Sequence, residues 1–436
     1  MTEDPVSDER VVEAFQQFLR IPSVSSEGPS GAYQLAVEWI ADYARNTAGL
    51  TSIKTVEYVK GKPVVLIEWP GSQPELPRIV LNSHYDVVPV MEEHWDMDPF
   101  AAFKDSSSGR IYGRGTQDMK CVCVQYLAAV SRLRRAGFQP TRTVYLSFVP
   151  DEEIGGVDGA LKFLESEEWK AIQPVGLALD EGLANPHDKF TVFYGERTPW
   201  WLMVRAEGST GHGSRFIKHT AVEKLMSVCN KALAFRKEQE DALGHSGGCS
   251  HAQAKKLGDV TTLNLTMLKA GVPLDMGDEG GAKEVYALNV IPNEALAGFD
   301  IRVSPDTPLM DIKAHLDEWC REEGLSWKFA DWTRPSFEHH VSSIDRDENP
   351  WWGLLLDTMK AIGIEVETEI FPAGTDSRFI RGLGIPAFGF SPMRNTPILL
   401  HDHNEYIDEA VFLEGIGIYK RVITDLASAG RLPTEK

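Results

Sequence analysis

Three side chains that could bind a metal ion are concentrated in residues 81 to 120. His84 and Asp86 follow directly after the apolar run RIVLN, and Asp118 follows the glycine-rich turn GRG, just before a segment with a helical pattern. Side chains at such segment ends can converge on one point, and an imidazole with carboxylates is a ligand set of metal-dependent hydrolases. The stretch therefore predicts part of a metal centre.

The rest of the chain supplies further imidazoles and carboxylates, most of which follow apolar runs. They are Glu152, Glu153, Asp180, Glu181, His401 and His403. One metal ion needs three or four ligands, so this larger set suits two ions that share a bridging carboxylate. The adjacent pair Glu152 and Glu153 could divide the work, one binding metal and one acting as base, because neighbours in a strand point to opposite sides. Asp86 could accept the second ring N–H of His84 and fix its tautomer.

The elements that must position these residues alternate between strands and helices at both ends of the chain. Residues 1 to 195 and 336 to 436 therefore predict one α/β domain in two pieces, with its ligands beyond the carboxyl ends of the strands. Residues 196 to 335 follow the order β-α-β-β-α-β, which is typical of a small split-βαβ, ferredoxin-like domain. Within it, residues 272 to 283 are rich in Gly and Asp and predict a surface hairpin loop.

Composition excludes several classes of partner. The chain has 44 basic and 64 acidic side chains, a net charge of −20, which argues against nucleic acid and anionic membranes because phosphate binding needs a basic face. No apolar run approaches the roughly 20 residues that cross a bilayer, and the N-terminal segment lacks the regions of a secretory signal. The five cysteines have no CxxC spacing, which favours free thiols in a reducing compartment. We therefore expect a cytoplasmic protein without nucleic-acid or membrane partners.

The motifs HYDVVP, GRGTQDMK, PDEEIGG, DEG and HDHNE occur in this order along the chain. Together they resemble the M20 family of co-catalytic metallopeptidases, and longer stretches such as FTVFYGERTPWW extend the resemblance over nearly the whole chain. The resemblance implies a mixed-sheet, zinc-peptidase-like catalytic domain, with residues 196 to 335 as an inserted lid and dimerisation domain. It also implies two zinc ions per subunit and a homodimer. The loop at 272 to 283 is longer than the family leads us to expect.

The resemblance assigns a role to each motif. The metal ligands would be His84, Asp118, Glu153, Glu181 and His401. Among them Asp118 would bridge both ions, while Glu152 would be the general base beside a metal-bridging hydroxide and Asp86 would orient the first imidazole. The family's ligand in DEG is the acidic residue before the glycine, which favours Glu181 over Asp180.

Four further assignments rest on the same resemblance. In HDHNE the family's ligand lies four residues before the glutamate, which favours His401 over His403. In GSTGHGSRF, His212 would support the oxyanion in the active site of the partner subunit. Asn289 in ALNVIP would touch the substrate, and Arg378 in GTDSRF would hold its α-carboxylate, since a guanidinium fork suits a planar carboxylate.

The expected reaction is hydrolysis of N-acyl-L-amino acids to a carboxylate and a free L-amino acid, because the long matching stretches are similar to the amidohydrolases of the M20 family. A dipeptidase or carboxypeptidase of the same family is the alternative. A non-catalytic metal-binding scaffold is a remoter one, since every ligand position and the base are present.

Overall fold

A computed structural model describes residues 4–244, 256–274 and 285–435. Most of the loop predicted at residues 272 to 283 lies outside the described residues. The chain forms two compact units: Met1–Gly195 with Val341–Glu369 and Thr375–Lys436, and Glu196–His340 with Ile370–Gly374. The roles of lid and dimerisation domain that we assigned to residues 196 to 335 stay predictions.

The first unit is built on an eight-stranded sheet in the order β1-β2-β6-β3-β7-β18-β8-β17. The strands are β1 Ser52–Val59, β2 Lys62–Trp69, β3 Arg78–His84, β6 Val144–Val149, β7 Val175–Asp180, β8 Phe190–Glu196, β17 Val366–Phe371 and β18 Ala387–Phe390. The central strands β6, β3, β7 and β18 are parallel, and β1, β2 and β8 pair in antiparallel fashion. The central strands are almost wholly buried, which explains their continuous apolar runs. The predicted mixed sheet is confirmed.

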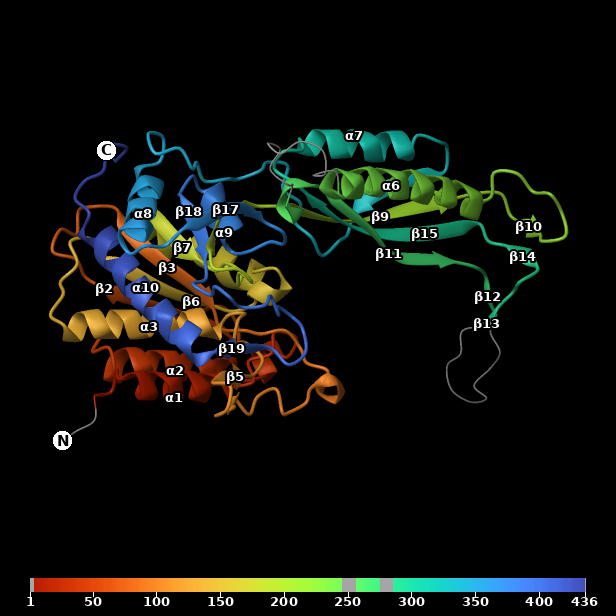
Figure 1. The fold of residues 1–436 in the computed structure, drawn as a ribbon. Helices are drawn as coiled ribbons and strands as arrows, with labels where there is room; N and C mark the ends of the chain where they lie inside the picture. Colours follow the sequence, from red (N-terminus) through yellow and green to blue (C-terminus); the bar gives the residue numbers. More distant parts are fainter. Residues whose placement is uncertain (1–3, 245–255, 275–284, 436) are drawn as a thin grey trace. The chain divides into compact units, whose positions relative to one another are not determined.

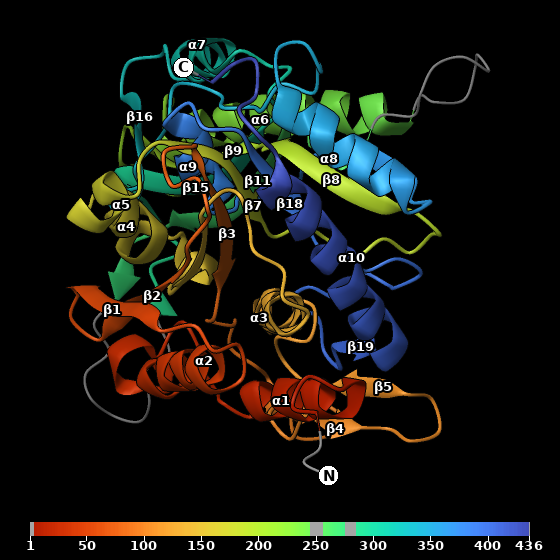
Figure 2. The same cartoon turned by 90° about the vertical axis from the view of Figure 1, so that its left-hand side faces the viewer.

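Helices cover both faces of this sheet (Figure 2). One face carries α1 Asp8–Leu19, α2 Tyr33–Asn46, α3 Lys120–Arg135, α8 Pro350–Ala361 and α10 Glu409–Ser428, and the other carries the shorter α4 Lys162–Leu164, α5 Glu167–Ala171 and α9 Ser377–Gly382. Alternate residues of β2 serve the two cores: Val65 and Ile67 join the first, Val64 and Leu66 the second. No helix in the described ranges is long and apolar enough to cross a membrane.

This arrangement brings the candidate ligands to one edge of the sheet. His84 ends β3, Asp180 ends β7, and Glu152 follows β6 in a short 3-10 turn, Glu152–Ile154. Because β3, β6 and β7 are parallel, their carboxyl ends share an edge. A separate small sheet consists of β4 Phe103–Lys104, β5 Arg110–Tyr112 and β19 Tyr406–Asp408. The chain segment after β5 carries Asp118, and the segment before β19 carries His401.

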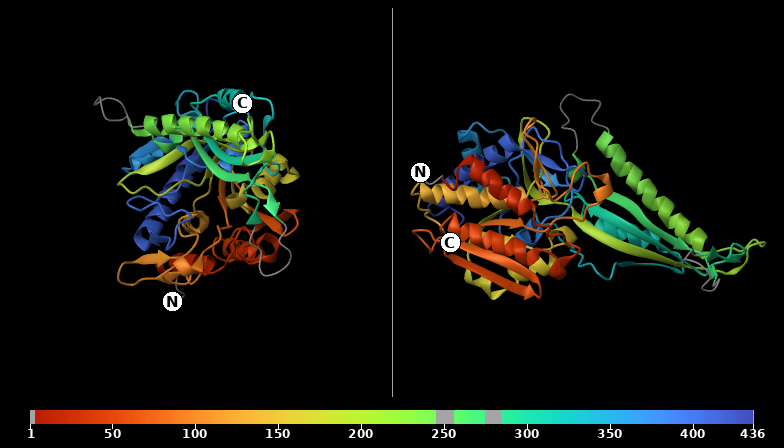
Figure 3. Two further views of the ribbon diagram at one scale, coloured as in Figure 1. Left: turned by 90° about the vertical axis from the view of Figure 1, so that its right-hand side faces the viewer. Right: turned by 90° about the horizontal axis from the view of Figure 1, so that it is seen from below.

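The second unit is a four-stranded antiparallel sheet in the order β11-β15-β9-β16. Its strands are β9 Thr198–Glu207, β11 Thr262–Ala270, β15 Glu294–Val303 and β16 Leu325–Phe329. Helices α6 Ala221–Gly244 and α7 Leu309–Trp319 pack on the same face (Figures 1 and 3). The order along the chain is the predicted β-α-β-β-α-β. Two short pairs complete the unit: β10 Gly211–His212 with β14 Val290–Ile291, and β12 Pro273–Leu274 with β13 Val285–Tyr286.

A buried ion pair anchors the C-terminal segment to the first unit. Arg142 is fully buried and meets both carboxylate oxygens of Glu435, Nη1 to Oε1 at 2.8 Å and Nη2 to Oε2 at 2.6 Å. It also donates to the carbonyls of Ala429 and Pro77, each at 2.9 Å. The segment after α10 therefore supplies acceptors that this arginine needs.

We expect Glu435→Gln to lower the free energy of unfolding by about 3 kcal/mol, because removing one partner leaves an uncompensated buried charge. Urea titration followed by tryptophan fluorescence measures the change. Glu167→Gln is the control, since Glu167 pairs with Lys170 at 2.6 Å on the surface and such pairs contribute at most about 1 kcal/mol. Equal losses in the two variants would contradict the prediction.

Candidate active site

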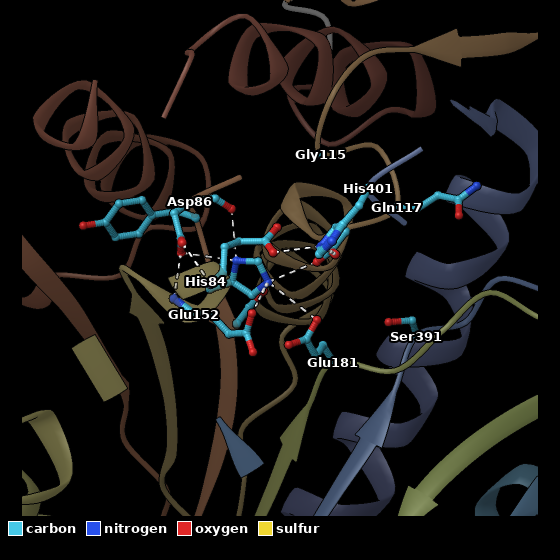
Figure 4. A network of polar contacts seen from close by, with 12 residues as sticks. His84, Asp86, Gly115, Gln117, Glu152, Glu181, Ser391 and His401 are labelled. Atoms are coloured by element: carbon cyan, nitrogen blue, oxygen red, sulfur yellow. Dashed lines mark hydrogen bonds and ion pairs between the residues drawn. The ribbon is translucent and has the colours of Figure 1, made fainter. Parts of the chain in front are cut away.

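His84 is the best-defined member of the site (Figure 4). The ring is buried, and its Nδ1 lies 3.0 Å from the carbonyl oxygen of Asp86 and 3.3 Å from Oδ1 of the same residue. The second nitrogen, Nε2, therefore faces carboxylates: Asp118 Oδ1 at 3.2 Å, Glu181 Oε2 at 3.5 Å and Glu152 Oε2 at 3.9 Å. Burial lowers the pKa of this imidazole, but the carboxylates, Glu181 foremost, outweigh it and raise the pKa well above its usual value.

Asp118 lies between two imidazoles. Its Oδ1 is 3.2 Å from His84 Nε2, and its Oδ2 is 3.2 Å from His401 Nε2, which is itself 2.9 Å from Glu153 Oε2. Burial disfavours the Asp118 carboxylate, but the adjacent imidazoles of His401 and His84 hold its pKa below the ordinary value. Each oxygen of this one carboxylate thus faces a different imidazole, as a bridging ligand would.

The turn that carries Glu152 and Glu153 is held by Asp86. The backbone N–H of Glu152 donates to Asp86 Oδ1 and that of Glu153 to Asp86 Oδ2, both at 3.2 Å. The turn is entered through Asp151 at φ 64° and left through Gly155 at φ 104°. Asp86, predicted only to orient His84, therefore also sets the main chain of the two glutamates.

Burial shapes the acidity of these glutamates. It raises the pKa of Glu153 to about 7, with a further contribution from Asp118. It raises the pKa of Glu152 well above the usual range, helped by Glu181. Carboxylates crowded in a buried site either hold protons or need cations.

The neighbours Asp180 and Glu181 differ in their surroundings. Asp180 Oδ1 accepts a hydrogen bond from Asn82 Nδ2 at 3.0 Å, and its Oδ2 accepts one from Ser377 Oγ at 2.7 Å. Glu181 instead faces His84 (Figure 4). Both oxygens of Asp180 are therefore engaged with the scaffold, while Glu181 is the one available as a ligand.

We expect Glu181→Gln to lose roughly half of the bound metal and Asp180→Asn to keep it, because a neutral amide is a poor ligand for a divalent ion. Metal content after dialysis, measured by plasma mass spectrometry, distinguishes the two. Both substitutions keep the shape of the side chain and remove its charge, so Asp180→Asn is a matched control for Glu181→Gln. Metal loss confined to Asp180→Asn would reverse the assignment.

The structure brings His401 to the cluster and leaves His403 outside it. His401 lies at φ 60°, and hydrogen bonds with Asp118 and Glu153 raise its pKa to about 10. The ring of His403 is exposed and lies against that of His94, with centroids 5.0 Å apart.

The residues present fit divalent metal ions. Buried His84 Nε2, Asp118 Oδ1 and Glu153 Oε1 have no hydrogen-bond partner among the described residues. Two groups of side chains hold potential ligand atoms within 4.8 Å of one another: His84 with Glu152 and Glu181, and His84 with Asp118 and Glu153. Imidazole nitrogens with carboxylate oxygens are ligands that zinc accepts. The unpartnered atoms therefore have the chemistry of a metal centre.

Arg378 is tied to the backbone beside the Glu152 turn. Its Nη1 donates to the carbonyl of Thr375 at 2.8 Å and its Nη2 to that of Gly155 at 2.7 Å. Each of these nitrogens keeps a second N–H for a ligand. The structure thus holds the guanidinium in place, and its role toward a substrate stays a prediction.

His212 and Asn289 lie together at one end of the second unit. His212 pairs with Val290 between β10 and β14, and the N–H of Gly213 donates to the carbonyl of Asn289 at 2.7 Å. Both side chains are exposed. The two residues that the resemblance assigned to the lid are therefore neighbours, and their catalytic roles stay predictions.

Two buried carboxylates near the ligands were not predicted. Asp376 is buried, its oxygens have no hydrogen-bond partner in the described part of the chain, and burial followed by Asp180 raises its pKa well above the usual value. Glu405 is fully buried beside Arg114. Both lie inside motifs already named, Asp376 in GTDSR and Glu405 in HDHNE. The sequence feature that could have identified them is an acidic residue within a segment predicted to be buried.

Comparison with known proteins shows which family the chain resembles along its length. The model of Peptidase family M20/M25/M40 matches residues 80–425. The chain is 48% identical over 425 residues to aminoacylase-1 of Dictyostelium discoideum, covering 97% of this chain and 99% of the other. It is 46% identical over 434 residues to human aminoacylase-1, covering 99% and 98%.

Solved structures show the same fold at low identity. An M20 family metallo-carboxypeptidase from Sulfolobus solfataricus matches with a TM-score of 0.70 at 18% identity, covering 96% of this chain and 99% of the other. A dinuclear metal-binding M20 peptidase of Bacillus subtilis matches with a TM-score of 0.63 at 15% identity, covering 96% and 97%. With its motifs, its fold and these full-length relatives, the chain belongs to Peptidase family M20/M25/M40.

Proposed function

We propose that this chain is a metal-dependent amidohydrolase that cleaves N-acyl-L-amino acids to a carboxylate and a free L-amino acid. The observation that carries the proposal is the division of Asp118 between two imidazoles, with Glu152 close by. The full-length likeness to proteins named aminoacylase-1 supports this substrate class over others in the family.

Two zinc ions are the proposed cofactor. His84 and Glu181 would hold one ion, His401 and Glu153 the other, and Asp118 would contact both. Such ions, when bound, polarise the amide carbonyl and lower the pKa of an attacking water. Asp86 keeps the first imidazole in the tautomer whose Nε2 is free for a ligand.

Glu152 is the proposed general base. It accepts a proton from the attacking water and returns it to the amide nitrogen as the C–N bond breaks, so that the amino acid leaves as an amine. Burial raises the pKa of this carboxyl, and nearby bound cations would favour its ionised form, which is the form that accepts the first proton. The hydrogen bond from the backbone N–H of Glu152 to Asp86 Oδ1 fixes the turn that carries the Glu152 side chain.

Substrate contacts and the partner subunit complete the proposal. Arg378 would bind the α-carboxylate through its remaining N–H groups, and Asn289 would touch the substrate. His212, exposed on the second unit, would stabilise the oxyanion in a second copy of the chain. The protein would be a cytoplasmic homodimer, and the four free cysteines of the described segments, all buried, support a reducing compartment.

A panel of substrates on zinc-reconstituted protein tests the proposal. We expect N-acetyl-L-methionine to be hydrolysed with a kcat/KM about 100-fold above that of L-alanyl-L-methionine. N-acetyl-D-methionine is the stereochemical control. Faster cleavage of the dipeptide would assign a peptidase of the same family, and hydrolysis of neither by metal-loaded protein would leave a binding function.

A further inference from the structure

Glu405 is a buried anion that is not among the proposed ligands. Its side chain is fully buried, and its Oε2 lies 2.7 Å from Nη1 of Arg114, which is 2% exposed. It lies four residues after His401 and immediately before β19. A charge at this depth needs compensation beyond one ion pair.

The compensation comes from the GRGTQD turn, which wraps around the carboxylate. The N–H of Gly115 donates to Oε2 at 3.1 Å, and the N–H groups of Gln117 and Asp118 donate to Oε1 at 2.6 and 3.3 Å. The hydroxyl of Thr116 adds a further bond at 3.3 Å. Successive backbone N–H groups that converge in this way form an anion-binding nest, here filled by a side chain 287 to 291 residues away. Gly115, at φ 91°, permits the turn.

The contact is reciprocal. The side chain of Gln117 points back into the other loop, donating to the carbonyls of Tyr406 at 2.7 Å and Pro397 at 3.1 Å and accepting from the N–H of Leu399 at 3.0 Å. The carbonyl of Glu405 accepts from the N–H of Gly113 at 3.0 Å. Figure 4 shows Gln117 and His401 on these adjoining segments. The loop that carries Asp118 and the loop that carries His401 are therefore locked together.

We propose that Glu405 is a positioning residue: its carboxylate sets the main chain of Asp118 against His401 and thereby sets the metal affinity of the site. The Asp118 N–H binds Glu405, while the Asp118 carboxylate faces both imidazoles. A shift of this turn displaces the one residue shared by the two centres. Glu405 touches neither ion nor substrate in this scheme, which rests on the proposed metal centre.

The test is Glu405→Gln, which keeps the shape and removes the charge. We expect metal affinity, measured by competition with a chromogenic chelator, to fall about 10- to 100-fold, as for other residues that support ligands. We also expect the visible spectrum of the cobalt-substituted protein to change, because the ligand geometry changes. Hydrolysis is recorded separately from both readouts.

The chain offers a matched control in Glu435→Gln. Glu435 is also the buried partner of a buried arginine in the first unit, so the variant loses comparable stability but should keep wild-type metal affinity and cobalt spectrum. Should Glu405→Gln fail to fold, Gln117→Leu breaks the reciprocal side of the lock and should lower metal affinity in the same direction.

Three results would overturn the inference: unchanged affinity and spectrum in Glu405→Gln, an equal loss of affinity in Glu435→Gln, or, where Glu405→Gln does not fold, unchanged affinity in Gln117→Leu. A wild-type protein that binds cobalt and responds to Glu405→Gln but hydrolyses no N-acyl amino acid would refute the proposed function while supporting the positioning role. Wild-type protein that binds no metal would refute both.

Discussion

Glu152→Gln is expected to lower kcat for N-acetyl-L-methionine by about 10²- to 10⁴-fold, the range that general base catalysis supplies. The amide cannot take up the proton of the attacking water, and it cannot deliver one to the leaving nitrogen. The hydrogen bond that anchors residue 152 to Asp86 Oδ1 uses only the backbone N–H of residue 152, so the turn and Glu153 should keep their positions. Metal content should stay at the wild-type level.

The pH profile separates this role from a structural one. In the wild type, kcat/KM should fall on the acid side as the base becomes protonated, and the residual activity of Glu152→Gln should lack that limb. Glu165→Gln, at a surface pair with Lys162 2.6 Å apart, is the control for a charge change. A near-normal rate, or a rate loss accompanied by metal loss, would remove Glu152 from the role of base.

Much of the first unit could be predicted because its local patterns are strong. The apolar runs of β3, β6 and β7 mark buried parallel strands, and polar residues just beyond them must lie at the edge where such strands end. That reasoning places His84 and the Glu152–Glu153 pair correctly. It holds because parallel strands buried on both faces have near-continuous apolar sequences, which can be recognised locally.

The choice between neighbouring polar residues required contacts from elsewhere in the chain. Asp180 and Glu181 are equivalent by position after β7, and they differ only because Asn82 and Ser377, 98 and 197 residues away, engage both oxygens of Asp180. No local periodicity encodes such a contact. The family resemblance supplied the preference for Glu181, and in the structure it is Glu181 that faces His84, while its role as a ligand stays a prediction.

The burial of Glu405 could not be predicted either, because it also depends on contacts from a distant part of the chain. A glutamate after HDHN is an ordinary polar residue in sequence terms, and burial of a lone carboxylate is unfavourable. It becomes favourable here because the GRGTQD turn, about 290 residues earlier, presents its N–H groups to it. A pattern can indicate a turn, but it does not reveal which anion fills it.

Metal removal is expected to abolish hydrolysis and to lower the melting temperature by an amount that increases with pH. Without metal, Glu152, Glu153 and Glu181 have raised pKa values because they are buried, and His84 and His401 have raised pKa values because of the carboxylates around them. All five groups therefore bind protons more tightly in the folded protein than in the unfolded chain.

The sign of the effect follows from linkage. For Glu153, the stabilisation is complete below the unfolded pKa of about 4.3 and is lost as pH rises through its folded pKa of about 7. His401 contributes in the same direction, with loss as pH rises through about 10. A buried group of this kind can contribute about 1.4 kcal/mol for each pH unit between its two pKa values, while His401, with a side chain 55% exposed, contributes less because solvent screens its interactions. Asp118, whose pKa is lowered, acts oppositely but only in acid, below the range concerned.

Bound metal replaces these protons, since ligands bind as carboxylates and neutral imidazoles and release protons on binding. The difference in melting temperature between zinc-loaded and chelator-treated protein should thus be small near about pH 5.5 and large near about pH 8.5. Thermal scans at matched ionic strength measure it. Glu153→Gln provides the control: with its proton-binding group gone, the chelated variant should lose less stability across this range than the chelated wild type. A metal effect that is constant with pH would mean that cation-for-proton exchange does not govern the stability of this cluster, and that its carboxylates are compensated by fixed charges of the scaffold instead.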